Sequence, residues 1–194
     1  MVIIGVIAAI TVPSLINKTN NQETVSKLKK AYSVMAQATN QIIAEEGPAT
    51  NWVTTPEFVY ELYRKKLLNA KECGTEIGCM TQSYKHLHKG DTPVWHLSDS
   101  YRRLVLADGV QIMFDPDIYS LCDKSSIDST NYCARFYIDI NGEKKPNIHG
   151  RDVFSFVLKK QGLYPRGCED DNECDSGYGW ECTCRVLREG AINY

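Results

Sequence analysis

The sequence lacks the short motifs with which common enzyme classes assemble their catalytic groups. It holds no GxSxG or HExxH motif, no glycine-rich phosphate loop and no Ser/His/Asp arrangement. It also lacks an excess of positive charge, since its net charge is -2 at pH 7. A nucleic-acid-binding protein needs a basic surface for the phosphate backbone, so no nucleic-acid partner is expected. These absences predict a protein that is not an enzyme.

Cysteine is absent before Cys73, yet the rest of the chain contains eight cysteines. An even set behind an apolar N-terminus is typical of an oxidising compartment and of disulfide bonds. Zinc sites need closer pairs such as CxxC, and the spacings here suit them poorly. Paired cysteines also leave no thiolate nucleophile. The predicted disulfide cysteines are Cys73, Cys79, Cys122, Cys133, Cys168, Cys174, Cys182 and Cys184.

The connectivity of these cysteines is open at the level of sequence, because eight cysteines allow many pairings. Short separations favour two local pairs, Cys73–Cys79 and Cys122–Cys133. The remaining four cysteines, all after residue 167, are then expected to pair among themselves.

No apolar run is long enough by itself for a typical bilayer-spanning helix. Residues 1–16 carry no charge, whereas a membrane span needs about 20 apolar residues. A secretory signal peptide has a basic region before its apolar run and a small-residue cleavage site after it. Both are missing here, which favours an anchor for membrane or assembly over a signal peptide. A single-span anchor that does not assemble stays an alternative.

An amphipathic pattern continues from this opening and predicts one helix over residues 1–46. Pro13 lies inside it and removes a backbone donor, so a kink is expected there; Gly47-Pro48 ends it. At 1.5 Å per residue the helix would reach roughly 70 Å, which is too long for one small domain to bury. We therefore expect its first part to lie in lipid or against other chains, and its second part to lie along the globular head. The apolar stripe of the second part is Val25, Leu28, Tyr32 and Met35.

Residues 47–194 predict a globular, disulfide-rich head of the α+β class. Thr55 followed by proline is typical of a helix start, and a short helix is expected through Leu68. Two β-rich runs around Asp108-Gly109 predict a hairpin. We expect an antiparallel β-sheet that packs on the long N-terminal helix. The other expected segments are a loop at 69–91, strands at 94–97, 136–140 and 153–158, and an edge strand at 180–187.

The segment IIGVIAAITVPSLI resembles the hydrophobic helix of type IV pilins and type II secretion pseudopilins. Gly5, Ala8, Ala9 and Pro13 fall where that family places its glycine, alanines and proline. The runs SKLKKAYSVMAQATNQI, YIDINGEKKPNIHGRDVFSFVL and GWECTCRVLREGAINY resemble the stalk and head of a prepilin-type subgroup. The resemblance implies a pilin-like fold.

This resemblance also implies a structural subunit of a type IV pilus or of a type II secretion pseudopilus. Such subunits rest in the bacterial inner membrane with the head outside the cytoplasm, then polymerise into a periplasmic pseudopilus or a cell-surface pilus. The implied partners are other pilin or pseudopilin subunits, the inner membrane, and a prepilin peptidase where a full-length leader exists. The family's leader and first mature residues do not precede Met1, so we expect the encoded chain to begin further upstream.

Within such a filament the N-terminal helix would carry assembly. Small residues allow helices to approach closely, and a proline marks a point where a helix bends. The residues predicted to act in assembly and membrane contact are Gly5, Ala8, Ala9, Pro13, Val25, Leu28, Tyr32 and Met35. The alternative is a membrane-tethered, disulfide-stabilised extracytoplasmic binding module that does not polymerise.

One stretch of the head carries the oxygen ligands that calcium prefers, namely Asp139, Asn141 and Asp152. Some pseudopilins hold calcium in a head loop. The spacing is not that of an EF-hand, and Asn141-Gly142 is a common turn dipeptide, so a structural turn is favoured and calcium is the alternative. No other cofactor is expected. The histidines predicted to lie at the surface or in loops, and not to bind metal, are His86, His88, His96 and His149.

Overall fold

A computed structural model describes residues 3–53, 55–81, 83–90, 98–116, 132–168, 174 and 177–194, with the backbone alone described at residues 3–18. Its described part contains a 44-residue helix and a six-stranded antiparallel β-sheet. The predicted α+β class with disulfide bonds is therefore confirmed. The elements are α1 (Ile3–Glu46), η1 (Ala49–Asn51), α2 (Pro56–Lys66), β1 (Lys71–Gly74), β2 (Arg102–Val105), β3 (Gln111–Phe114), β4 (Ala134–Asp139), β5 (Val153–Lys159), β6 (Gly162–Pro165) and α3 (Cys182–Glu189).

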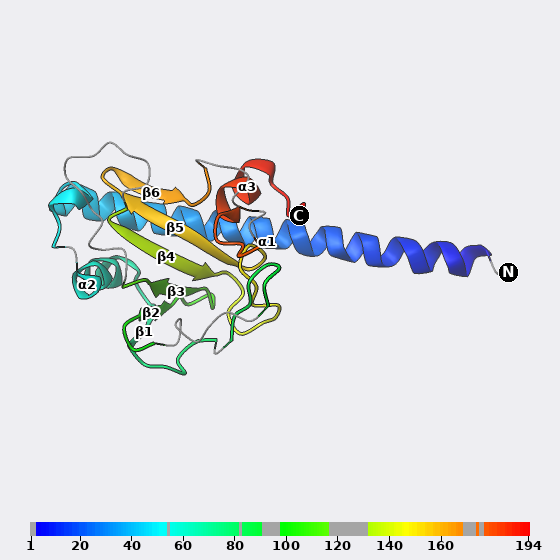
Figure 1. Ribbon diagram of the computed structural model, residues 1–194, viewed down its shortest axis with the longest axis horizontal. Coiled ribbons are helices and arrows are strands. Elements are labelled where there is room, and N and C mark those ends of the chain that lie inside the picture. The colour runs from blue at the N-terminus through cyan, green and yellow to red at the C-terminus, as the bar shows by residue number, and fades with distance from the viewer. Residues whose placement is uncertain are drawn as a thin grey trace.

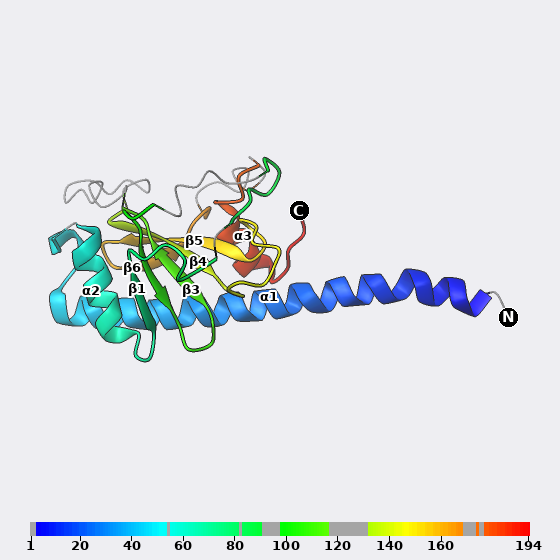
Figure 2. The same ribbon diagram turned by 90° about the horizontal axis from the view of Figure 1, so that it is seen from below.

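Helix α1 runs beneath the sheet and then continues beyond it. Both views show its N-terminal part projecting from the head as a single helix (Figure 1, Figure 2). The helix passes Pro13 without interruption. It ends at Glu46. The next residue, Gly47, has a φ of 80°, and its N–H donates to the carbonyl of Ile43 at 2.9 Å. Glycine adopts this left-handed conformation readily because it has no Cβ atom.

The second half of α1 packs on the sheet through the apolar stripe. Val25, Leu28 and Met35 are buried and belong to the same hydrophobic core as the sheet. Tyr32 is partly buried, and its ring stacks on Phe156 of β5 with 5.5 Å between centroids. One amphipathic helix face thus supplies one wall of the core.

Helix α2 covers the end of the sheet farther from the N-terminus and also touches α1. Its N-cap is Thr55, whose side chain accepts a hydrogen bond from the N–H of Phe58. Tyr63 is fully buried, and its hydroxyl lies 2.7 Å from that of Thr39 on α1. The ring of Tyr63 meets Phe114 of β3 edge to face. These contacts join α1, α2 and the sheet in one core.

The sheet is a meander in which each strand pairs with the next, in the order β1 to β6. The register alternates side chains between two faces. Phe136 and Phe156 are paired and belong to the core around α1, whereas Tyr137 and Ser155, the next pair, face the other side. Arg103 of β2 shares that outer face and is buried. One sheet face is therefore apolar and the other carries buried polar groups.

Several strand predictions are confirmed, and others are wrong or lie outside the described residues. The hairpin around Asp108-Gly109 forms as β2 and β3, and the second predicted pair forms as β4 and β5. Strand β1 falls in the predicted loop 69–91, and β6 was not predicted. The predicted strand at 94–97 lies outside the described residues.

The predicted edge strand at 180–187 is wrong, because this stretch enters helix α3. The following Gly190 adopts a φ of 65° and caps the helix, as glycine commonly does. In a strand, Cys182 and Cys184 would share one face. On a helix two positions apart point in different directions, and the two cysteines accordingly bond to different partners.

Candidate functional site: the N-terminal helix and the adjoining end of the head

The projecting part of α1 is the first candidate site. Its sequence, IIGVIAAITVPSLI over residues 3–16, contains no charged residue. The predicted assembly residues Gly5, Ala8, Ala9 and Pro13 all lie on this part of the helix, but their side chains are outside the described set. In the part of the chain that the structure describes, no helix combines the length and apolarity that a membrane crossing needs.

The other four predicted assembly residues lie on the opposite half of the helix. Val25, Leu28 and Met35 are at most 5% exposed, and Tyr32 donates its hydroxyl to the carbonyl of Leu163 at 3.3 Å. Their apolar character is therefore accounted for by packing within the chain. A second chain could reach them only if α1 separated from the head.

A cavity of about 670 Å³ lies where α1 leaves the head. We call it the junction cavity. One wall is α1, and the other is the loop between β4 and β5 together with the C-terminal segment. Polar and basic side chains line most of it, including Asn20, Asn21, Lys27, Lys144, Lys145 and Arg151.

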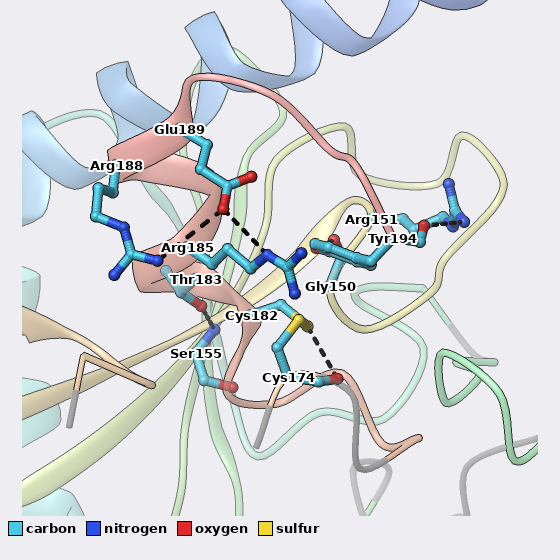
Figure 3. Close-up of a disulfide and its surroundings, with 10 residues drawn as sticks. All are labelled: Gly150, Arg151, Ser155, Cys174, Cys182, Thr183, Arg185, Arg188, Glu189 and Tyr194. Carbon is cyan, nitrogen blue, oxygen red and sulfur yellow. Dashed lines mark hydrogen bonds and ion pairs between the residues drawn. A yellow bond between two sulfur atoms is a disulfide. The ribbon is translucent and has the colours of Figure 1, made fainter. Parts of the chain in front are cut away.

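The C-terminal segment closes the head beside this cavity. Asn21 of α1 donates its side-chain amide to the carbonyl of Ile192 at 3.5 Å. The guanidinium of Arg151 donates to the carbonyl of Tyr194 at 3.0 Å, and the Tyr194 hydroxyl donates to the carbonyl of Gly150. Figure 3 shows Tyr194 lying across Gly150 and Arg151. The end of the chain is therefore fixed against the β4–β5 loop.

All cysteines in the described residues are oxidised. The predicted Cys73–Cys79 pair is confirmed, and so is pairing among the last four cysteines. Cys133 is disulfide-bonded, while its predicted partner Cys122 lies outside the described residues. The pairs of the C-terminal set are Cys168–Cys184 and Cys174–Cys182.

The Cys174–Cys182 disulfide joins Cys182, the first residue of α3, to Cys174 eight positions earlier in the chain (Figure 3). The next residue, Thr183, accepts a hydrogen bond at its Oγ1 atom from the backbone N–H of Ser155 at 2.9 Å. The backbone just before α3 can lie close to His149 because Gly179 has no side chain. A Cβ atom at Gly179 would lie 2.2 Å from the carbonyl oxygen of His149. The disulfides therefore fix residues 177–194, which we call the C-terminal lobe, against the rest of the head.

Asp139, the first residue of the suggested calcium loop, is fully buried at the end of β4. Its Oδ1 atom accepts hydrogen bonds from the N–H groups of Asn141 and Gly142 at 3.1 and 2.9 Å. The hydroxyl of Tyr84 donates to its Oδ2 atom at 3.3 Å. Burial, and then the charge of nearby Asp152, raises the pKa of Asp139 to about 8. At neutral pH this carboxyl is mainly protonated.

Asp152 closes the other side of the same loop. Its carboxylate accepts hydrogen bonds from the N–H groups of Asn147 and Ile148 at 2.8 and 2.6 Å, and from the side-chain amide of Asn141 at 3.1 Å. Burial raises its pKa. Both aspartates thus hold turns through backbone N–H groups, which supports the structural interpretation.

Within the described residues no group of three or more His, Cys, Asp or Glu side chains is arranged to hold a metal ion. Calcium binding by Asp139, Asn141 and Asp152 remains an alternative that can be tested. The turn interpretation predicts that the melting temperature is the same with calcium and with a chelator. A higher melting temperature in calcium, lost on changing Asp152 to Asn, would assign a metal to the loop.

The structure brings together two histidines that sequence reasoning treated as scattered. His86 and His149 lie in loops, one of the two positions predicted for the histidines, and both are buried there. Their ring centroids are 6.0 Å apart, and Trp180 lies edge-on to both. Burial lowers the pKa of His149 to about 3. The residues are far apart in sequence, and no local motif indicates their contact.

His88 is exposed, and His96 lies outside the described residues. The outer face of the sheet near His149 also holds an ion pair between Arg135 and Asp115. The two buried histidines and this ion pair are packed into the head and do not line the junction cavity. We therefore assign them to the stability of the head.

Comparison with known proteins identifies a family for the chain. A model described as "Family of unknown function (DUF6613)" matches residues 14–182, so the chain belongs to this family. Among curated proteins and among solved structures, no match to this chain was found. The matched residues include the second half of α1, the whole sheet and Cys182, the first residue of α3.

Proposed function

We propose that this member of the DUF6613 family is a structural subunit of an extracytoplasmic filament, of the type IV pilus or type II secretion pseudopilus kind. In this proposal the subunits polymerise through residues 3–16 of α1. The observation that carries the proposal is the division of α1 into a half that packs on the head and an apolar half that projects from it.

The physical argument is that a projecting apolar helix needs cover. Each Å² of apolar surface left in water costs about 25 cal/mol, and the core residues of α1 among the described side chains all belong to its other half. Gly5, Ala8 and Ala9 would let the backbones of neighbouring helices approach closely. A bundle of such helices, with the heads outside, would cover the projecting halves with one another, while each packed half stays covered by its own head.

The proposal includes a stage before assembly in the bacterial inner membrane, with the head outside the cytoplasm. An oxidising compartment suits the disulfides of the head. The pilin-like character of the fold is part of this proposal, and the 44-residue α1 laid along a meander sheet is what supports it. The proposed role is mechanical, and no catalytic step is included.

The experiment places a charge on the projecting half. Ala9→Glu is expected to abolish filaments in negative-stain electron microscopy of cells that express the full chain, because a buried carboxylate is costly in an apolar bundle. Asn40→Glu is the matched control, since it adds the same charge at an exposed site on the packed half.

Normal filaments from Ala9→Glu would refute assembly through this half of the helix. If the wild-type chain forms no filament and stays a monomer at every concentration, the tethered binding module becomes the better account. Loss of filaments in both variants would show that charge on α1 in general is harmful and would also contradict the proposal.

A further inference from the structure

The loop between β4 and β5 places two adjacent lysines at the end of the head from which α1 projects. Lys144 and Lys145 are both exposed and both line the junction cavity. Lys27 of α1 and Arg151 line the same cavity. This end of the head therefore carries four basic side chains around one opening.

The other charged groups of the cavity are already engaged. Glu23 forms an ion pair with Lys27 at 2.7 Å, and Asp152 is buried under backbone N–H groups. Arg151 donates its guanidinium to the carbonyl of Tyr194. Lys144 also lies near Glu23, whose pKa its charge helps to lower, and the neighbouring Glu143 is exposed. With Glu23 paired to Lys27, the two lysines still exceed Glu143 by one positive charge, and this excess is what can act on a partner.

These lysines lie close to the end of the apolar segment. The cavity begins at Asn20 and Asn21, and Ile16 is four residues before Asn20, which corresponds to about 6 Å along a helix. If residues 3–16 enter an apolar phase, the two lysines stand at its boundary with water.

We propose that Lys144 and Lys145 bind the anionic headgroups of the membrane in which residues 3–16 of α1 are held. The inference rests on the membrane stage of the proposed function. The ligand chemistry is a lipid phosphate with net negative charge, as in phosphatidylglycerol. Nucleic acid is disfavoured as the partner, because the patch has only two adjacent lysines and the chain as a whole carries a net charge of -2.

The contact would set the orientation of the head. Two lysines on the β4–β5 loop, pulled to the headgroups, hold that side of the head against the bilayer while α1 stays inserted. Entry into a filament then requires this electrostatic contact to break. Because the contact lies at the surface, it weakens as salt is raised.

The test measures binding of the full chain to two kinds of vesicle, one of phosphatidylcholine alone and one with a fraction of phosphatidylglycerol. The variant is Lys144→Gln/Lys145→Gln. The matched control is Lys65→Gln/Lys160→Gln, which removes the same charge from exposed lysines on α2 and on the β5–β6 turn. A basic group at an anionic membrane surface strengthens binding about fivefold.

We expect the wild-type chain and the control to prefer the anionic vesicles, and the preference to fall about 25-fold in the Lys144/Lys145 variant, fivefold for each lysine. Binding to phosphatidylcholine alone should be unchanged, and high salt should remove the wild-type preference. Inorganic phosphate as a competitor distinguishes a lipid headgroup from free phosphate as the ligand. If free phosphate competes at low concentration, the lysines form a site for the free ion, and the lipid assignment is overturned.

Two outcomes distinguish failure of the inference from failure of the proposed function. Equal binding of wild type and variant to both vesicle kinds would overturn the headgroup contact and leave the filament proposal intact. No binding of the wild-type chain to any vesicle would remove the membrane stage and the inference with it. Lysine-dependent binding to a duplex DNA oligonucleotide without a lipid preference would replace the lipid partner with nucleic acid.

Discussion

The two halves of α1 belong to one uninterrupted helix, yet they meet different surroundings. Residues 25–46 are amphipathic, and their apolar stripe is covered by the sheet and α2. Residues 3–16 carry no charge on any side and project beyond the head. A helix that is apolar on one face can be satisfied by one sheet, whereas a helix that is apolar all round needs cover on every side.

The comparison teaches that the apolar residues of this helix divide into two groups by partner. The stripe at Val25, Leu28 and Met35 is part of the fold. The uncharged residues before Asn17 lie on the projecting part of the helix, and in the proposed function their partners are other chains or lipid. Substitutions in the packed half should therefore change the stability of the head, and substitutions in the projecting half should change assembly.

The largest expected effect on stability comes from the packed half. Leu28→Ala removes a fully buried side chain from the core and should lower the free energy of unfolding of the head by about 2–5 kcal/mol. Leu15→Ala makes the same chemical change in the projecting half and should alter it by less than about 0.5 kcal/mol. Urea unfolding followed by tryptophan fluorescence measures both. Equal losses of unfolding free energy in the two variants would contradict the division of α1 into a packed half and a projecting half.

The C-terminal lobe rests beside α1 and gives the next largest effect. Replacing both Cys168 and Cys184 with Ser opens a loop of sequence separation 16 and should cost about 3 kcal/mol by the chain-entropy relation. The same change at Cys73 and Cys79, with separation 6, should cost about 2.4 kcal/mol. Thermal unfolding of the two double variants, both without reductant, gives the comparison. A larger loss at Cys73 and Cys79 would contradict it.

The head's stability should also depend on pH, with the sign set by two buried groups. The pKa of Asp139 rises from 3.8 to about 8, so the folded chain holds a proton that the unfolded chain releases above pH 3.8. That contribution falls as pH rises toward 8. The pKa of His149 falls from 6.5 to about 3, so its contribution grows as pH rises to 6.5. The two largely cancel between about pH 4 and about pH 6.5.

Stability should then fall by about 2 kcal/mol between about pH 6.5 and about pH 8, because Asp139, with its pKa of about 8, still binds a proton there in the folded chain. Asp139→Asn should remove this fall, while its amide oxygen can accept the same backbone hydrogen bonds. Asp108→Asn is the control, since the pKa of Asp108 is lowered and its contribution changes only in acid. An alkaline fall that persists in Asp139→Asn would show that another group causes it.

The smallest effect concerns the polar contact between α1 and α2. Tyr63→Phe removes the hydroxyl that meets Thr39 at 2.7 Å and should cost about 1 kcal/mol, the usual net value of one hydrogen bond. Thr39 keeps its bond to the carbonyl of Met35, which limits the loss. Tyr164→Phe, at a half-exposed ring, is the control. No change in Tyr63→Phe would mean that packing alone joins the packed half to α2.

Much of this architecture could be predicted from sequence because local patterns specify it. Steps of three and four residues mark the stripe on α1, and Asp108-Gly109 between β-rich runs marks the first hairpin. The N-cap at Thr55 marks the start of α2. In each case the residues that determine the element are within a few positions of one another.

The wrong and missing predictions involve contacts between distant positions or short elements. Strand β1 is four residues long and pairs with β2 some thirty positions away, so its own sequence carries little signal. Helix α3 has the alternation of a strand at Cys182 and Cys184, but disulfides to two different partners fix it as a helix. The contact between His86 and His149 forms only once the β4–β5 loop and the segment before β2 meet.

For the candidate site, the sequence predicted which half of α1 is apolar but not which apolar residues remain for partners. That distinction required the burial of the stripe under the sheet. The junction cavity was not predicted, because its walls come from α1, the β4–β5 loop and the C-terminal segment. Lys144 and Lys145 follow a turn dipeptide and have no local pattern that indicates a binding surface.

The most direct measurement is site-specific photo-crosslinking in cells that express the full chain, with a photoreactive residue at Ala9 in the projecting half or at Asn40 in the packed half. The account predicts crosslinks between copies of this chain at Ala9, seen as dimers and larger multimers, and none at Asn40. Crosslinks between copies at Asn40 with none at Ala9, or a monomer from both positions, would contradict assembly through the N-terminal half of α1.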